Sequence, residues 1–400
     1  MSEPTPYRKT RDQFGVFGGR FVPEPLWTPM AELAAVHQQA MADEEYLRNE
    51  RRWQYARLGR PTPVTYLRAL SSMIGGAQIW AKREDLCEGG TFCSTSALTQ
   101  ALIARRMGKK HLIGETATGD FGVALGSVGA AMGMEVTILM RRAAIEDERF
   151  NSARMRQLGV NLVSVDGSGR GRSQAMAEAL RHYSVDPEGT FYATSSLASP
   201  SPYPAMVGRA LSVIGEECRR QIAEEEVGLE YVIAPVGSGS FAAGLYQAFL
   251  KNGGPQLVGV QAGGDEGTTR SAASLVRGRP GVHLGTRSLV LQDEEGQILA
   301  PHSGARGLAI PIAGPQHARW LQEGRVHYVM IDDEAAIEAQ RQLARVEGIF
   351  ASHETGYALA YAMKLAPTLR SEQHILVGIS GGGLRGIEDV EEDHETGGGA

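Results

Sequence analysis

Short β-rich apolar runs alternate with helical patterns along most of this chain. The runs lie at residues 77–80, 111–114, 136–140, 161–165, 231–235, 256–260 and 374–378. Helical spacing of apolar residues predicts helices at 96–107, 122–132, 173–183, 205–225, 242–251 and 333–347. Strands that alternate with helices pair in parallel, because each helix carries the chain back across the sheet. The pattern therefore predicts an α/β protein with two doubly wound, mainly parallel sheets.

The composition is that of a globular protein, and the charge excludes two classes of partner. The chain has 400 residues, 42% hydrophobic and 22% charged, which is enough for two domains with substantial cores. The formal net charge is −6 and no basic run occurs, so we expect no binding to nucleic acid or anionic membranes. The sequence has no apolar span of 18 residues and no hydrophobic signal region at its start. We therefore expect a soluble, cytoplasmic protein.

The sequence contains three cysteines, Cys87, Cys93 and Cys218. An odd number argues against a disulfide framework, and their spacing matches no metal-binding motif. The cysteines fit a reducing compartment, and the sequence predicts no metal site.

A glycine- and serine-rich turn joins one predicted strand to the next helix, and reads Pro235-Val-Gly-Ser-Gly-Ser-Phe-Ala-Ala-Gly244. Backbone N–H groups at a helix start point outward with the positive end of the helix dipole, which favours a phosphate or another anion. The same composition is also typical of a tight turn without a ligand. The candidate phosphate-binding residues are Gly237, Ser238, Gly239 and Ser240.

Several motifs, in order along the chain, resemble the β chain of tryptophan synthase. They are Arg60-Pro-Thr-Pro63, Lys82-Arg-Glu-Asp-Leu86, Gly114-Glu-Thr116, Arg154-Met-Arg156, Ser201-Pro-Tyr-Pro-Ala-Met-Val207, Gly314-Pro-Gln-His317 and Glu347-Gly-Ile349. The resemblance extends from about Gly18 to Arg385. It implies the two-domain fold of the fold-type II pyridoxal-phosphate (PLP) enzymes, with the ligand in a cleft between the domains.

The resemblance also implies where the domains lie. Residues 1–58 and 92–210 would form an N-terminal α/β domain with a mobile subdomain at about 108–195, and residues 59–91 and 211–385 a C-terminal α/β domain. The last segment, 386–400, is acidic and glycine-rich, which predicts a disordered tail. We expect a homodimer.

The decisive departure from the family is Cys93. The family's loop reads His-Lys-Ile-Asn-Asn-Ala-Leu, and its lysine forms the Schiff base with PLP, whereas the aligned residues here are Phe92-Cys93-Ser94-Thr95-Ser96-Ala97-Leu98. A thiol cannot form that imine. Of the other lysines, Lys82 matches a family lysine that is not the Schiff base, and the rest have terminal, helical or surface-like contexts. A helix start can activate a thiol, but a small buried thiol in place of the amine is the simpler interpretation.

Further departures replace polar groups of the family's cofactor cradle with apolar ones. Two family histidines become Phe92 and Phe121, and an asparagine of the phosphate loop becomes Phe241. An aspartate that contacts the hydroxyl of serine becomes Ala309. Three phenylalanines in one cavity predict a pocket for a hydrophobic ligand, and each desolvated aromatic face stabilises a developing cation by ~1 to 2 kcal/mol. The alternative is a collapsed pocket in which phenylalanines fill the vacated space.

Glu115 and Asp120 are the candidate acid/base residues. Glu115 follows the predicted strand at 111–114 and matches the family glutamate that handles the proton of indole. A partly desolvated carboxyl has its pKa raised towards the range of a general acid or base; a capping or salt-bridged glutamate is the alternative. The family loop that holds the substrate carboxylate reads Gly-Ala-Gly-Gln-His-Gly, and here it is Ala117-Thr-Gly-Asp-Phe-Gly122. Asp120 would repel that carboxylate, which excludes an amino acid substrate.

Two parts of the family's cofactor site are retained. Ser380, in Gly378-Ile-Ser-Gly-Gly-Gly383, matches the serine placed against the pyridine nitrogen, although a serine after a buried strand is also a common turn former. The loop at 237–240 keeps small residues. We expect no covalently bound cofactor, with non-covalent PLP or phosphate as alternatives.

These observations predict a repurposed, PLP-independent, tryptophan synthase β-like enzyme of specialised metabolism. It would use Glu115 and Asp120 for carbon–carbon bond formation or cyclisation of a hydrophobic or indole-containing substrate. A second hypothesis is an inactive pseudoenzyme that acts as a partner or regulatory subunit of an active chain, through the segment Gly18 to Glu24. A third is a protein that binds PLP without a covalent bond.

Overall fold

The computed structural model describes residues 13–166, 172–251, 253–265 and 270–383. The tail predicted to be disordered, 386–400, lies outside these residues. No helix in the described ranges is both long enough and apolar enough to span a membrane.

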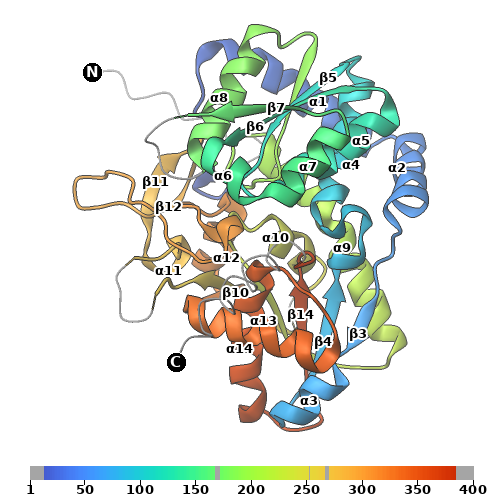
Figure 1. The fold of residues 1–400 in the computed structure, drawn as a ribbon, viewed down its shortest axis with the longest axis vertical. Helices are drawn as coiled ribbons and strands as arrows, with labels where there is room; N and C mark the ends of the chain where they lie inside the picture. The colour runs from blue at the N-terminus through green and yellow to red at the C-terminus, as the bar shows by residue number, and fades with distance from the viewer. Residues whose placement is uncertain (1–12, 167–171, 252, 266–269, 384–400) are drawn as a thin grey trace, which may run out of the picture.

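The described residues form three sheets, and the two that are mainly parallel carry most of the fold (Figure 1). The six-stranded sheet has the order β13-β10-β9-β14-β4-β3, with β3 at Val64–Tyr66, β4 at Gln78–Arg83, β9 at Leu229–Pro235, β10 at Gln256–Ala262, β13 at His327–Ile331 and β14 at His374–Ile379. Only its edge strand β3 runs antiparallel to its neighbour. The predicted α/β class with mainly parallel sheets is confirmed.

The second sheet has four parallel strands in the order β7-β6-β5-β8. They are β5 His111–Glu115, β6 Glu135–Arg141, β7 Asn161–Val165 and β8 Thr190–Ala193. A third, antiparallel sheet was not predicted and consists of β1 Gln13–Phe14, β2 Phe17–Gly18, β12 Thr286–Val290 and β11 Arg279–His283. Its first two strands have two residues each, too few to show an alternating pattern.

Helices cover the sheets. In chain order they are α1 Trp27–Met41, α2 Glu44–Leu58, α3 Arg68–Ile74, α4 Cys93–Arg106, α5 Asp120–Met132, α6 Arg142–Asp147, α7 Arg149–Gln157, α8 Arg172–Val185, α9 Tyr203–Glu224, α10 Ser240–Tyr246, α11 Ser274–Arg277, α12 Pro315–Gln322, α13 Asp333–Glu347 and α14 His353–Leu365. Local sequence sets several boundaries. Asp43 caps α2 by accepting from the N–H groups of Glu45 and Tyr46, and Gly59 ends it in the left-handed conformation.

All seven predicted strands and five of the six predicted helices are present within a few residues. The helix predicted at 242–251 is wrong at its end, because α10 stops at Tyr246. There the Tyr246 hydroxyl donates to the carbonyl of Val258 (2.6 Å), and the N–H of Phe249 turns back to the Tyr246 carbonyl (2.8 Å). A tertiary hydrogen bond thus fixes the helix end where the sequence pattern continues.

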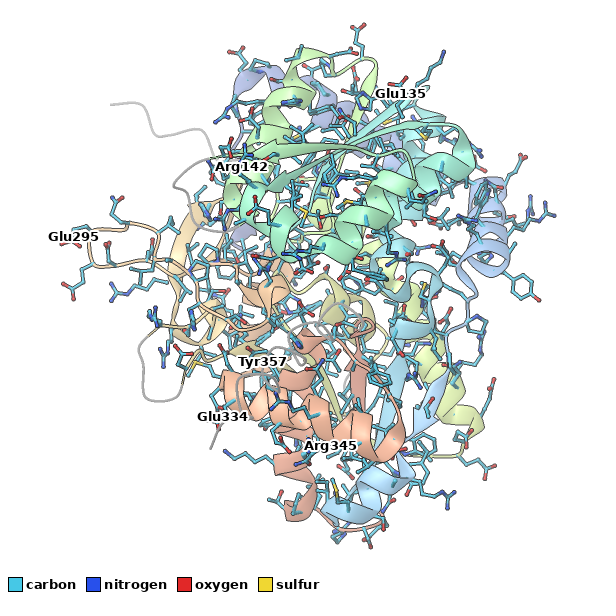
Figure 2. All side chains as sticks on the ribbon, in the orientation of Figure 1. Glu135, Arg142, Glu295, Glu334, Arg345 and Tyr357 are labelled. Atoms are coloured by element: carbon cyan, nitrogen blue, oxygen red, sulfur yellow. The ribbon has the colours of Figure 1, made fainter. Side chains whose placement is uncertain are left out.

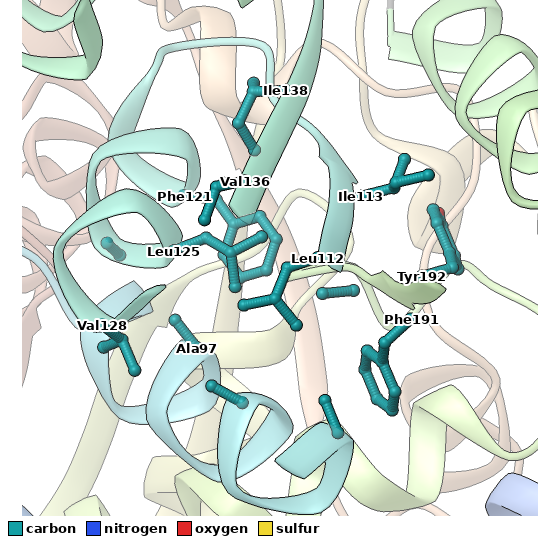
Figure 3. Close-up of a cluster of buried hydrophobic side chains, with 14 of the residues drawn as sticks. Ala97, Leu112, Ile113, Phe121, Leu125, Val128, Val136, Ile138, Phe191 and Tyr192 are labelled. Carbon is teal, nitrogen blue, oxygen red and sulfur yellow. The ribbon is translucent and has the colours of Figure 1, made fainter. Parts of the chain in front are cut away.

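The core follows the strand alternation. On β14, Ile375 and Val377 pack on the α13 and α14 side, whereas Leu376 packs on the α9 and α10 side. A separate cluster surrounds the four-stranded sheet, where Leu112 and Phe121 meet (Figure 3). Charged side chains such as Glu135 and Glu295 project from the surface (Figure 2).

The two mainly parallel sheets come from different parts of the chain. The strands of the parallel four-stranded sheet come from 111–193, and those of the six-stranded sheet come from 64–83 and 229–379. The predicted domain boundaries stay a prediction.

Candidate functional site

A cavity of about 100 Å³ lies where the first turns of four helices meet. These helices are α4, α5, α10 and α14, and the segments that follow β5, β9 and β14 complete the wall. The carboxyl ends of parallel strands are where α/β proteins bind ligands. The wall consists of Thr91, Phe92, Cys93, Thr116, Ala117, Thr118, Asp120, Phe121, Ser195, Pro235, Gly237, Ser238, Gly239, Ser240, Phe241, Gly307, Leu308, Ser352, Glu354, Ser380 and Gly381.

Most of the residues that the sequence singled out meet in this wall. Ala309 and Glu115 are the exceptions, since neither belongs to the described residues that line the cavity. Ala309 follows the lining residues Gly307 and Leu308, and Glu115 precedes Thr116. The expected contact of these two positions with the ligand space is therefore absent from the described wall.

Phe92 and Phe241 form one apolar side of the cavity. Their ring centroids lie 5.4 Å apart with the planes tilted by 48°, and Phe241 is 3% exposed. A side chain at Gly378 would bring its Cβ to 2.5 Å from Cε1 of Phe241, so the glycine makes room for the ring. Phe121 also lines the cavity but is packed into the core beside β5 (Figure 3). The first two rings therefore form a pair, and the third is part of the core.

Cys93 is the first residue of α4 and is 5% exposed. Its backbone N–H donates to the hydroxyl of Thr91 (3.2 Å). None of the lysines that the structure describes lines the cavity. Lys82 is fully buried elsewhere, where its Nζ donates to the Thr62 carbonyl (2.6 Å) and to Glu217 (2.9 Å). The described wall therefore offers a thiol and no primary amine.

Glu115 ends β5 and is fully buried. The Tyr192 hydroxyl donates to its Oε2 and the Thr194 hydroxyl to its Oε1, both at 2.8 Å. These bonds join the ends of β5 and β8, so they hold the four-stranded sheet together where it meets the cavity. The carboxylate is thus held by hydroxyl groups behind Thr116, and its acid/base role stays a prediction.

Two carboxylates line the cavity, and sequence reasoning found only one of them. Asp120 begins α5, and its Oδ1 accepts from the side-chain amide of Asn151 (2.9 Å). Glu354 lies in the first turn of α14, is 9% exposed, and accepts from the backbone N–H of Gly307 (3.0 Å). No lysine, arginine or histidine side chain belongs to the described lining.

The positive ends of the helix dipoles attract an anion in the cavity, whereas the two carboxylates repel it. Each helix start carries about half a positive charge, worth ~0.3 to 1 kcal/mol to a nearby anion. A full negative charge about 4 Å from an anion repels it by ~4 kcal/mol at an effective dielectric constant of about 20. Asp120 and Glu354 already occupy the first turns of α5 and α14. The two carboxylates therefore oppose the attraction that the helix starts exert on an anion.

His317 forms a hydrogen bond with the glycine- and serine-rich loop at Gly239. Burial lowers the pKa of His317 to about 4, so the ring is neutral at pH 7. Its Nε2–H donates to the Gly239 carbonyl (2.7 Å), which leaves Nδ1 to accept from the Tyr328 hydroxyl (2.7 Å). A Cβ on Gly239 would lie 2.1 Å from the His317 ring, and Gly239 has a φ of +88°. Only glycine fits this position.

Ser380 lies in a small group of hydroxyls at the end of β14. Its Oγ is 3.3 Å from that of Ser352 and 3.4 Å from that of Thr355. Its carbonyl accepts from the N–H of Phe92 (3.1 Å), which ties β14 to the start of α4. Ser380 therefore joins the two sides of the cavity.

PLP, the cofactor of the family that the sequence resembles, sets requirements for the cavity wall. A Schiff base needs a lysine, and the described wall has none. A phosphate can bind the backbone N–H groups of a helix start, but Asp120 and Glu354 bring negative charge to the same wall. Pockets for drug-sized ligands hold roughly 300 to 1,000 Å³, against about 100 Å³ here. The residues present do not fit a Schiff-base-bound PLP.

A second group of polar side chains lies outside the cavity wall. The ligand atoms of Asp265, His302 and Asp333 lie within 4.8 Å of one another, so this group could hold a metal ion. Asp265 is also paired with Arg270 (3.3 Å). The sequence predicted no metal ligands, because these residues are far apart along the chain and form no spacing motif.

Comparison with known proteins places this architecture in a family. The family model described as pyridoxal-phosphate dependent enzyme matches residues 55–381. The tryptophan synthase beta chain of Methylibium petroleiphilum is 42% identical over 383 residues, which cover 95% of this chain and 92% of the relative. Those of Leptothrix cholodnii and Xylella fastidiosa are each 41% identical, over 96% and 95% of this chain and 90% and 94% of their own lengths. The chain therefore belongs to the tryptophan synthase β chain family of pyridoxal-phosphate dependent, fold-type II enzymes.

Proposed function

We propose that this member of the family works without PLP, as an enzyme that acts on a small hydrophobic molecule. The observation that supports the proposal is Cys93 at the start of α4, in a described cavity wall without a lysine. The reaction class we propose is carbon–carbon bond formation or cyclisation, on a hydrophobic or indole-type substrate. From the family resemblance we also propose a cytoplasmic homodimer with a role in specialised metabolism.

The residues of the wall divide the chemistry between them. Asp120 brings a carboxylate into the cavity, where it can accept a proton from the substrate and return it. The faces of Phe92 and Phe241 stabilise positive charge that develops on the substrate. Glu115 enters the reaction only if the cavity extends past Thr116, a movement that an indole-sized substrate requires.

The absorption spectrum of the purified protein tests the loss of the Schiff base. We expect no internal-aldimine band, even after incubation with PLP, because the described wall supplies no amine. L-serine and indole should give no tryptophan. A band that borohydride removes would overturn the proposal.

Cys93→Lys is the matched variant for the same test. We expect it to remain inactive with L-serine and indole, because Asp120 and Glu354 still repel a carboxylate and a phosphate. The alanine at 309 also lacks the side chain that contacts the hydroxyl of serine in the family. Robust tryptophan formation by Cys93→Lys would show that the charge argument is wrong.

A partner or regulatory subunit is the second candidate. The small cavity and the position of Glu115 behind Thr116 favour it. The protein would be mixed with an active tryptophan synthase β chain, and hetero-oligomers and the rate of tryptophan formation would be measured. A stable hetero-oligomer with an altered rate, lost when Gly18 to Glu24 are replaced, would favour this candidate over an enzyme.

A further inference from the structure

A groove of about 570 Å³ lies between helices α2 and α4, outside the cavity wall. The two helices lie side by side (Figure 1), and they are joined where the Thr99 hydroxyl donates to the carboxylate of Glu50 (2.5 Å). The volume lies in the range of ~300 to 1,000 Å³ that is usual for small-molecule sites. The described lining consists of Asp43, Glu45, Tyr46, Arg48, Asn49, Arg52, Leu102, Arg105 and Arg106.

Positive charge gathers in this groove. Four of its lining side chains are arginines, and two are carboxylates. Arg48 and Arg52 come from α2, and Arg105 and Arg106 from the last turn of α4. The whole chain has a formal net charge of −6, so the groove has the opposite sign to the molecule.

The acids of the groove do not pair with all of this charge. Arg106 contacts Asp43 at 2.7 Å, and Arg48 reaches a carboxylate only at 3.8 Å. Arg52 and Arg105 form no ion pair with any carboxylate that the structure describes. One guanidinium group on each helix is therefore available to a ligand.

Helix stability explains part of the charge and leaves the rest unexplained. A cation in the last turn of a helix is stabilised by the negative end of the helix dipole, which accounts for Arg105 and Arg106. Arg48 and Arg52 lie four residues apart in the middle of α2, where like charges on one helix face repel each other. An anion bound between the helices would offset that repulsion.

The chemistry of the guanidinium group narrows the class of anion. Its planar fork of N–H donors matches the oxygens of carboxylates and phosphates. A single exposed ion pair contributes little, so an anion with one charged group would gain little here. An anion with several linked groups can contact Arg52 and Arg105 together. Phosphate suits this better than carboxylate, because each group carries more negative charge and more acceptor oxygens.

We propose that the groove between α2 and α4 is a second binding site, for a small compound with two or more linked phosphate groups. Arg52 and Arg105 contact the ligand from the two helices, and Arg48 and Arg106 add positive charge beside them. The groove shares no described lining residue with the cavity, so the site does not depend on the proposed function.

Three anions test the proposal: inorganic triphosphate, inorganic phosphate and citrate. Their dissociation constants for the full-length protein would be measured by calorimetry at pH 7. We expect triphosphate to bind at least about tenfold more tightly than either of the others. Raising the salt concentration from about 50 to about 300 mM should weaken triphosphate binding by about tenfold, because salt screens exposed charges.

Two variants each remove one charge from the groove. Arg52→Gln and Arg105→Gln should each weaken triphosphate binding by at least about fivefold. Arg51→Gln is the matched control, because Arg51 is exposed on the same helix and does not belong to the described lining. It should change the dissociation constant by less than about twofold. Thermal melts of the three variants verify that they are folded.

Each of the other outcomes would overturn the proposal. Equal affinities for triphosphate and phosphate would mean that no site spans the two helices. Tightest binding of citrate would exclude the phosphate class. A loss in Arg51→Gln as large as that in Arg52→Gln would mean that triphosphate follows the general surface charge. No binding of triphosphate at millimolar concentration would exclude the site, and the proposed function of the cavity would be unaffected.

Discussion

Two pairs of carboxylates in this protein lie in different surroundings. Glu84 and Glu217 are buried against two cations: Arg60 contacts both, at 2.8 and 3.1 Å, and Lys82 contacts Glu217 at 2.9 Å. That cluster balances two positive against two negative charges. Asp120 and Glu354, by contrast, share a described cavity wall without a cationic side chain.

The difference distinguishes the buried charge cluster, which is part of the structural framework, from the cavity, which is the candidate site. The balanced cluster joins the segment before β3, strand β4 and helix α9. Arg60 and Lys82 belong to motifs through which the sequence resembles the family, whereas Cys93, Asp120 and Phe241, which line the cavity, are positions predicted to depart from it. The contrast is therefore between a buried framework of paired charges and a cavity wall that has no cationic side chain among its described residues.

The largest effect is expected from Arg60→Ala. Arg60 is 4% exposed, and its loss leaves Glu217 paired with Lys82 and Glu84 with the hydroxyl of Thr62. Breaking a buried ion pair by removing one partner costs about 3 to 5 kcal/mol. Urea-induced unfolding should show a loss near the upper end of that range. Arg142→Ala is the control, because Arg142 pairs with Asp166 at the surface and should lose less than about 1 kcal/mol. Equal losses of unfolding free energy in the two variants would mean that the buried cluster stabilises the protein no more than a surface ion pair does.

Phe241→Ala tests the apolar side of the cavity. The ring is 3% exposed and packs against Phe92 and over Gly378, so its removal should cost about 3 kcal/mol. The cavity should widen, and benzene-sized molecules should bind more tightly than to the unaltered protein. Phe350→Ala, at a position that is 56% exposed, should change stability by less than about 0.5 kcal/mol. A variant that is stable and does not bind such molecules would argue that Phe241 merely fills collapsed space.

The regular part of the fold was predictable because strand and helix periods are local. The runs at 256–260 and 374–378 needed only their neighbours along the chain to be read as strands. Strand β8, four residues at Thr190–Ala193, was missed because so short a run has little periodicity. The third sheet was missed because β1 and β2 have two residues each and because β2 pairs with the distant strand β12.

The site was predictable only where the resemblance gave aligned positions. Phe92, Cys93 and Asp120 were named from the family's loops, and all three line the cavity. Glu354 and His317 were missed because their partners are distant: Glu354 accepts from Gly307, 47 residues away, and His317 donates to Gly239, 78 residues away. No local pattern records contacts of that separation.

Lowering the pH should destabilise the folded protein through His317, which contacts the cavity loop at Gly239. Burial lowers the pKa of His317 from 6.5 to about 4, so between these values the unfolded chain binds a proton that the folded chain does not. The stability from this group is present above pH 6.5 and is lost as the pH falls towards 4, by about 3 kcal/mol in total. Unfolding midpoints measured from pH 7 to pH 4 should record the loss.

His317→Gln isolates this contribution from the rest of the acid sensitivity. The variant should be less stable at pH 7, because glutamine replaces a ring that bonds to both Gly239 and Tyr328. Its stability should fall less steeply between pH 6.5 and pH 4, since no group titrates at that position. Parallel curves for the variant and the unaltered protein would show that His317 does not titrate as described.

The smallest effects on stability are expected from Glu84→Gln and Glu354→Gln, which each replace one carboxylate with an amide of the same shape. Glu84 is fully buried and accepts from both terminal nitrogens of Arg60, so removing its charge leaves that guanidinium undercompensated and should cost about 2 kcal/mol. Glu354→Gln keeps an acceptor for the Gly307 N–H and loses ~0.3 to 1 kcal/mol of favourable helix-dipole energy. Its stability should therefore fall by less than about 1 kcal/mol. Equal losses in urea for the two variants would mean that the charge of Glu354 supports the fold as much as the charge of Glu84 does, and the contrast between framework and site would fail.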